Sequence, residues 1–114
     1  MNKIRAIIII LILLLSSCNF TENTNQIFGD QYFKTAIALI ELHKIRYKEY
    51  PKSLSELKYI GEWDKIIFSS VEYQKLPNGY MLNLVKGWMG KPATLQYPPD
   101  FWDGLGLKES NLKK

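Results

Sequence analysis

Cysteine and histidine are almost absent from this chain of 114 residues, which contains one of each. A single cysteine cannot form an intrachain disulfide, and it argues against metal sites built from several thiolates. The single histidine, His43, leaves a zinc enzyme or a histidine-based triad without enough partners. The length suffices for one domain, and 46% apolar with 23% charged residues is typical of a globular chain.

Long apolar runs are also missing, apart from one at the start of the chain. Lys3 and Arg5 precede ten consecutive apolar residues, 6–15 (AIIIILILLL). As a helix this run would extend about 15 Å, roughly half of a ~30 Å hydrocarbon core, so a membrane span is not expected. A cationic start before a short apolar run is typical of a secretory signal peptide. The alternative is a buried N-terminal helix.

The apolar run is followed by Leu15-Ser16-Ser17-Cys18. This sequence resembles the lipobox of bacterial lipoproteins, in which a leucine and two small residues precede the cysteine that receives lipid. The resemblance implies that residues 1–17 are a signal peptide and that Cys18 carries diacylglycerol and palmitate. Two acyl chains anchor a protein stably, whereas a single chain binds only marginally.

Asn19 follows the cysteine, where an aspartate tends to retain lipoproteins in the inner membrane. The resemblance therefore implies a lipid anchor in the cell envelope. The outer membrane, on its periplasmic face, is favoured if the source has two membranes, and the cell membrane otherwise. Without Lys3 and Arg5, 13 of the 15 basic residues remain against 11 acids, a net charge of +2. No basic stripe remains to neutralise phosphates, so no nucleic-acid partner is expected.

Composition divides the rest of the chain into three segments. Residues 19–29 (NFTENTNQIFG) are mostly polar, which predicts that 18–29 is the lipidated cysteine and a flexible tether. Residues 30–110 are predicted to form one globular domain. The polar residues 111–114 are predicted to be a frayed tail.

The first element of the domain is predicted to be a long amphipathic helix over 30–50, with Asp30 as its N-cap. Its apolar residues at three- and four-residue spacing are Phe33, Ala36, Ile37, Ile40 and Tyr47. Pro51 ends this helix, because the residue before a proline is disfavoured in the α conformation. Ser53 and Glu56 then form an S-x-x-E capping box, which predicts a short helix from Leu54 to about Tyr59.

The second half of the domain is predicted to be a sheet. Alternating residues over 65–76 and 80–86 flank Pro77-Asn78-Gly79, and Asn-Gly is a strong hairpin signal. A third run, 93–97 (ATLQY), ends at Pro98. We therefore predict an α+β fold, in which a long helix and a short helix pack on an antiparallel sheet of about three strands.

Two stretches of this pattern resemble the soluble domain of type II secretion pseudopilins and type IV pilin-like proteins. They are Arg46-Tyr47-x-x-Tyr50-Pro51-x-Ser53-Leu54-x-x-Leu57 and Gly79-Tyr80-x-Leu82-x-Leu84, and the similarity covers about residues 36–85. The resemblance implies a pilin-like fold. Because a lipobox and a polar segment stand where pilins have a membrane-spanning helix, it does not imply fibre assembly.

No catalytic residue, metal ligand set or cofactor site is predicted. Two pairs of carboxylates are weighed as sites. Glu62 with Asp64 could serve glycoside hydrolysis, and Asp100 with Asp103 could bind calcium. Their positions in turn-like sequence favour solvated turns instead. The segment Asp100–Gly104 does not closely match the calcium loop of the major pseudopilin.

Aromatic residues are the remaining candidates for a binding surface. They are either anchors for a partner or the large core residues that a small domain needs. Trp102, Phe101 and Trp88 are the candidates for partner binding, and Trp102 is expected to be the most exposed because its loop is rich in proline.

Two classes of function remain open. The first is a non-catalytic, lipid-anchored module that binds another envelope protein, either a secretion or pilus component or a toxin that it neutralises as an immunity protein. The second is a small hydrolase or sugar-binding protein of the cell wall. The lack of nucleophile–base pairs and metal ligands favours the first class, and the chain is not expected to be an enzyme.

Overall fold

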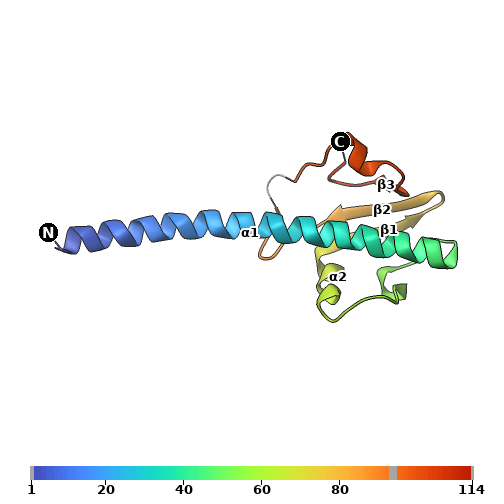
Figure 1. Cartoon of the computed structure of the whole chain (residues 1–114), viewed down its shortest axis with the longest axis horizontal. Coiled ribbons are helices and arrows are strands. Elements are labelled where there is room, and N and C mark those ends of the chain that lie inside the picture. Colours follow the sequence, from blue (N-terminus) through green and yellow to red (C-terminus); the bar gives the residue numbers. More distant parts are fainter. Residues whose placement is uncertain (1, 93–94, 114) are drawn as a thin grey trace.

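The protein is an α+β structure in which one long helix packs on a small sheet (Figure 1). This computed structural model describes residues 2–92 and 95–113, with the side chains of 15–19 outside the described part. The elements are α1 (Asn2–Tyr47), η1 (Leu54–Glu56), η2 (Trp63–Ile66), α2 (Ile67–Ser70), β1 (Val71–Leu76), β2 (Gly79–Leu84), η3 (Pro99–Trp102) and β3 (Leu107–Glu109). The predicted α+β class is confirmed, and the arrangement is consistent with a pilin-like fold.

Helix α1 is longer than the domain that packs on it. The chain measures 70 × 31 × 17 Å along its principal axes, and the N-terminal half of α1 projects from one end of the domain (Figure 1). The large apolar side chains between Ile4 and Leu14 are 50–63% exposed. Among the residues that the structure describes, none of the helices combines the length and apolar content that a bilayer crossing requires.

The polar segment 19–29 is helical, so the prediction of a flexible tether before a helix that begins at Asp30 is wrong. The composition of this segment does not reveal its tertiary contact: Phe28 packs against the core and against the ring of Trp88. Asp30 does not cap a helix, because it lies inside α1. Its carboxylate accepts a 2.8 Å hydrogen bond from the Tyr97 hydroxyl and lies 3.1 Å from the Lys34 amine.

Helix α1 ends at Tyr47, three residues before the predicted end. The next residue, Lys48, adopts a left-handed conformation with φ 67°, and its N–H donates to the Lys44 carbonyl at 2.9 Å. This hydrogen bond is that of a left-handed helix cap. The chain therefore leaves the helix before Pro51 can act on it.

The corner after Pro51 is less regular than predicted. Residues 54–56 form a single 3₁₀ turn, and Ser53 makes no capping hydrogen bond with its side chain. The Glu56 carboxylate instead accepts a 2.9 Å hydrogen bond from the Lys52 N–H. The predicted capping box is therefore not formed, and the helix does not continue to Tyr59.

The sheet has the strand order β1-β2-β3. Strands β1 and β2 form the predicted antiparallel hairpin, with Val71 opposite Leu84 and Leu76 opposite Gly79. The third strand is not 93–97: residues 95–97 are not in a strand, and 93–94 lie outside the described residues. Strand β3 takes this place, and it runs parallel to β2. The sheet is therefore mixed, not antiparallel.

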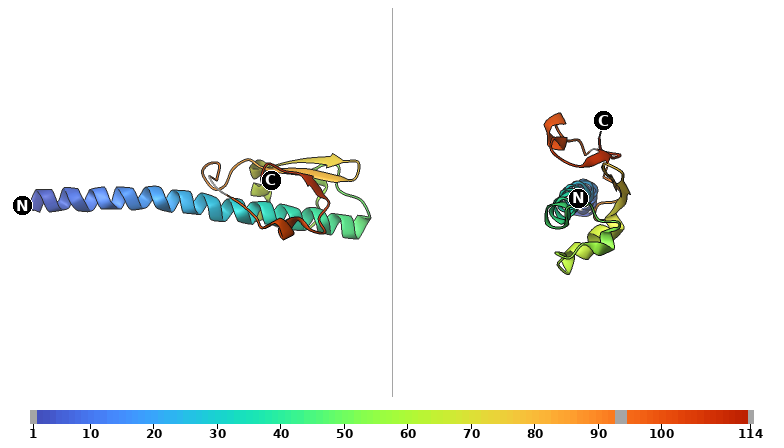
Figure 2. Two further views of the ribbon diagram at one scale, coloured as in Figure 1. Left: turned by 90° about the horizontal axis from the view of Figure 1, so that it is seen from above. Right: turned by 90° about the vertical axis from the view of Figure 1, so that its right-hand side faces the viewer.

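The core lies between α1 and the inner face of the sheet. Four of the five predicted helix residues, Phe33, Ala36, Ile37 and Ile40, are buried, whereas Tyr47 is 39% exposed. The sheet contributes Val71, Tyr80, Leu82, Leu84 and Leu107. Viewed along α1, the sheet and the segments at its two ends curve around one side of the helix (Figure 2).

The end of the chain is held by the sheet, so the prediction of a frayed tail over 111–114 is wrong for its described residues. Asn111 bonds to both backbone groups of Leu84: its side-chain amide donates to the carbonyl at 2.9 Å and accepts from the N–H at 3.0 Å. The Asn111 N–H donates to the Asn83 side chain at 2.9 Å, and Leu112 packs against the core. Lys114 lies outside the described residues.

Candidate functional site

The predicted lipid-attachment residue, Cys18, lies within α1, and its side chain is outside the described residues. It precedes Asn25, whose side chain accepts a hydrogen bond from the Met89 N–H of the domain, by seven residues. At 1.5 Å per residue, this spacing corresponds to about 10 Å along the helix axis.

Phe101 and Trp102 are packing residues. Both are half-buried against the core, so the expectation that Trp102 is the most exposed aromatic is wrong. The Phe101 ring stacks on Tyr97 with a centroid distance of 4.2 Å, and the Trp102 ring meets Phe33 edge-on at 6.1 Å. The proline-rich loop folds back onto α1, and this contact covers both rings.

Trp88 is the predicted partner-binding residue that remains open to solvent, with 52% of its surface exposed. Its ring packs against Phe28 at a centroid distance of 5.1 Å. Phe28 and Phe33 are five residues apart on α1, which places them about 140° apart around the helix at 3.6 residues per turn. The structure therefore separates Trp88 from Phe101 and Trp102, which pack on a different side of α1.

Trp88 borders an apolar groove with a volume of about 300 Å³ between α1 and the segment η2–α2. We call it the Trp63–Trp88 groove. Its other lining residues are Phe28, Gln31, Tyr32, Thr35, Asp64, Ile66 and Ile67. A concave apolar site bordered by aromatic rings suits the anchoring side chain of a protein partner.

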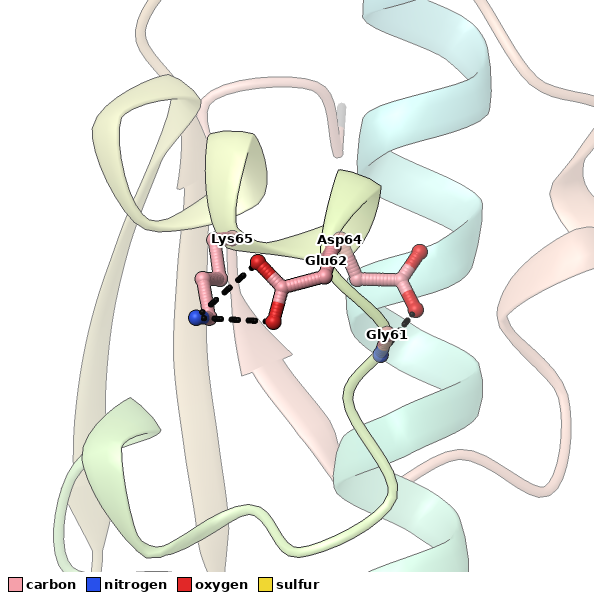
Figure 3. A network of polar contacts seen from close by, with 4 residues as sticks. All are labelled: Gly61, Glu62, Asp64 and Lys65. Carbon is pink, nitrogen blue, oxygen red and sulfur yellow. Dashed lines mark hydrogen bonds and ion pairs between the residues drawn. The ribbon is translucent and has the colours of Figure 1, made fainter.

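Trp63, at the edge of this groove, is 88% exposed and was not among the predicted binding residues. The signal in the sequence was its position between two acids, Glu62 and Asp64, whose charges disfavour burial. In Figure 3 the two carboxylates point in opposite directions. Asp64 accepts a 2.9 Å hydrogen bond from the Gly61 N–H, and Glu62 pairs with Lys65 at 3.3 Å. Both acids therefore make local contacts within the turn in which Trp63 is exposed.

The loop after β2, residues 86–91 (KGWMGK), is held closely against α1. Gly87 N–H donates to the Gly90 carbonyl at 2.7 Å, and Met89 N–H donates to the Asn25 side chain at 2.6 Å. A Cβ atom on Gly87 would lie 2.2 Å from the Asn25 carbonyl oxygen, so only glycine allows this approach. We call this segment the Trp88–Met89 loop.

A polar cluster around Glu41 joins α1 to the rest of the domain. Its carboxylate accepts hydrogen bonds from the Tyr50 hydroxyl at 2.9 Å, from the Tyr80 hydroxyl at 3.0 Å and from the Gly106 N–H at 3.1 Å. Burial and then the neighbouring carboxylate raise the pKa of both hydroxyls, that of Tyr50 to about 12. The cluster keeps both tyrosines neutral. Because its polar groups hydrogen-bond to one another, the cluster has the arrangement of a structural contact.

The other polar candidates form no described site. His43 is half-buried with its ring 4.7 Å from that of Tyr47, and its Nδ1 has no hydrogen-bond partner. Asp100 and Asp103 are exposed, and the Asp103 N–H donates to the Asp100 carbonyl. In the part of the chain that the structure describes, no three histidine, cysteine or acidic residues group as metal ligands would.

Comparison of the chain with protein-family models, with curated proteins and with solved structures finds no match.

Proposed function

We propose that this protein is a lipid-anchored, non-catalytic module of the bacterial cell envelope that binds another envelope protein. The anchor is carried by one observation, the Leu15-Ser16-Ser17-Cys18 sequence after a cationic start and a short apolar run. The partner is a component of secretion or pilus machinery, or alternatively a toxin that the protein neutralises.

The Trp63–Trp88 groove is the surface that supports partner binding. Exposed tryptophan is enriched among the residues that dominate binding energy at protein interfaces. Trp63 makes a large apolar surface available at 88% exposure, next to a groove into which a partner side chain can insert. Phe101 and Trp102 do not belong to this surface, because their rings pack against Phe33 and Tyr97.

Metabolic labelling with palmitate tests the anchor. Wild-type cells and cells expressing Cys18→Ala are grown with labelled palmitate, and the protein is isolated from each. We expect label in the wild-type protein and none in the variant, because lipid is attached through the cysteine sulfur. Equal incorporation in both proteins, or in neither, would contradict the lipid anchor.

Photocrosslinking in living cells tests partner binding. A photoreactive amino acid replaces Trp63, and in a matched control it replaces Lys108, which is exposed on β3. We expect a discrete protein adduct from position 63 that position 108 does not give. If both positions give the same adducts, or position 63 gives none, the groove is not a protein-binding surface.

A further inference from the structure

We propose that the Trp88–Met89 loop is a second membrane contact. Its two apolar side chains lie in the headgroup region of an anionic bilayer, and Lys86 and Lys91 bind the lipid phosphates. The inference rests on the proposed lipid anchor at Cys18, since that anchor determines which end of the domain faces the bilayer.

The loop lies at the end of the domain nearest the anchor. It contacts α1 at Asn25, about 10 Å along the helix axis from Cys18. Figure 1 shows the segment after β2 beside α1 where the free N-terminal half begins, and the turn between β1 and β2 at the opposite end. Because the headgroup region adds several ångströms to each face of the hydrocarbon core, tilting of α1 brings the loop into it.

The loop holds its apolar residues out in solvent. Met89 is 72% exposed and Trp88 is 52% exposed. The Gly87–Gly90 hydrogen bond and the contact of Met89 N–H with Asn25 fix the backbone in this arrangement. A well-held loop with an apolar tip loses little conformational entropy when the tip enters the bilayer, which favours binding.

The flanking residues match a lipid surface in charge. Lys86 and Lys91 are both exposed, and the segment 85–92 contains no acid. Glu22, one turn before Asn25, is the single acid in residues 1–29. Tryptophan is enriched at membrane interfaces, and lysine directs its ammonium group to the phosphates while its methylene groups lie along apolar surface. Basic residues close to the bilayer are also attracted electrostatically to anionic lipids.

The exposed apolar residues of α1 next to the anchor face away from the loop, because Ile27 lies about 160° around the helix from Asn25, which contacts the loop. Phe20 is 72% exposed and Ile27 is 64% exposed. Residues seven apart lie within about 20° of each other around a helix, so these two side chains form one stripe. The groove lies farther from the anchor, because its α1 residues run from Phe28 to Thr35. Trp88 belongs to both surfaces, so the bilayer covers the Trp88 end of the groove and a protein partner binds at its Trp63 end.

Site-directed spin labelling measures the depth of the loop directly. The lipidated chain carrying Met89→Cys is labelled with a nitroxide, since lipid blocks the Cys18 thiol, and is reconstituted into vesicles of phosphatidylcholine and phosphatidylglycerol. Oxygen concentrates in the bilayer, whereas a neutral nickel complex stays in water. We expect the ratio of oxygen to nickel accessibility at position 89 to exceed by several-fold that of the control Asn78→Cys, whose site is exposed in the turn between β1 and β2.

The lysines have their own test in the same vesicles. Lys86→Gln combined with Lys91→Gln should lower the accessibility ratio at position 89, and so should vesicles of pure phosphatidylcholine. A ratio at position 89 equal to that at position 78 would overturn the inference. A high ratio at position 89 that is independent of both lysines and of lipid charge would overturn the role of Lys86 and Lys91.

Failure of the anchor is distinguishable from failure of the loop. If Cys18 carries no lipid, its thiol also reacts and two labels per chain are found, which contradicts the proposed function. The loop is then measured on the full chain with Cys18→Ser and Met89→Cys, which binds the same vesicles through its exposed apolar residues 4–14. The same comparison with Asn78→Cys decides for or against the loop.

Discussion

Glu41 and Tyr80 meet across the interface of α1 and β2, where the tyrosine hydroxyl donates a 3.0 Å hydrogen bond to the carboxylate. Tyr80 is fully buried, so water cannot replace this partner. The same carboxylate oxygen accepts the Gly106 N–H, just before β3. One helix side chain thus joins the middle strand to the segment that leads into its parallel neighbour.

Glu41→Ala should lower the free energy of unfolding by about 1–3 kcal/mol, because it leaves the buried Tyr80 hydroxyl without an acceptor. Glu41→Gln should cost less, since its carbonyl can still accept one or two of these bonds. Urea denaturation measures both variants. Glu49→Ala is the matched control: it removes an exposed ion pair with Lys75, worth about 0–1 kcal/mol. Equal losses for Glu41→Ala and Glu49→Ala would contradict the structural role of Glu41.

The free energy of unfolding should fall at alkaline pH, because the folded protein holds the Tyr50 hydroxyl in its neutral form. Burial first, then the hydrogen bond and charge of Glu41, raise its pKa to about 12, above the ordinary tyrosine value of 10.0. This stabilisation is fully present below about pH 10 and is lost as the pH rises towards 12. Urea denaturation in steps across this window should show a smaller slope for Tyr50→Phe than for wild type.

The matched control for this pH dependence is Tyr59→Phe, because Tyr59 is 53% exposed. It should leave the slope unchanged. Some slope should persist in Tyr50→Phe, since burial and the nearby Glu56 charge also raise the pKa of Tyr73 to about 12. Identical slopes for wild type and Tyr50→Phe would show that the Glu41 cluster does not bias this hydroxyl.

Leu57→Ala should lower the free energy of unfolding by about 1–2 kcal/mol, because the side chain is only partly buried against the core. Ser53→Ala should change it by less than about 0.5 kcal/mol, since Ser53 caps no helix. Urea denaturation of the two variants tests the corner after Pro51. A larger loss for Ser53→Ala than for Leu57→Ala would support the capping box that the structure lacks.

Lys48→Gly should raise the free energy of unfolding by about 0.5–1 kcal/mol, because glycine adopts the left-handed conformation at this helix end without a side-chain clash. The backbone hydrogen bond from Lys48 N–H to the Lys44 carbonyl is retained. Thermal denaturation gives the direction of the change. Lys52→Gly, where φ is not positive, should be neutral or destabilising; stabilisation there as well would point to a cause other than backbone conformation.

The elements that could be predicted from the sequence are those specified by neighbouring residues. The hairpin follows from Asn78–Gly79 between two alternating runs, and the buried stripe of α1 follows from three- and four-residue spacing. Strand β3 has only three residues and no alternation of its own. Its pairing depends on tertiary contacts, such as the 2.9 Å bond from the Tyr80 N–H to the Gly106 carbonyl, which no local pattern encodes.

The candidate site could be predicted only in part, for the same reason. The sequence predicts Trp88 as a partner-binding residue, and its side chain is 52% exposed. Composition alone could not distinguish the half-buried Trp102 from the exposed Trp88. The burial of Trp102 depends on Phe33, which is 69 residues earlier in the chain. The contact between Phe28 and Trp88 likewise joins residues that are 60 positions apart, so no local pattern encodes it.

With the proposed lipid anchor at Cys18, the unbroken course of α1 from Phe20 into the domain makes the position of the domain relative to the anchor depend on the number of residues between them. Each residue of an α-helix advances the chain by 1.5 Å and turns it by about 100°. One residue inserted before Asn25 would therefore turn the domain by about 100° about the helix axis. Seven inserted residues would nearly restore its azimuth while raising it by about 10 Å. A flexible linker fixes neither quantity, whereas this helix fixes both the distance of the domain from Cys18 along the helix axis and its rotation about that axis.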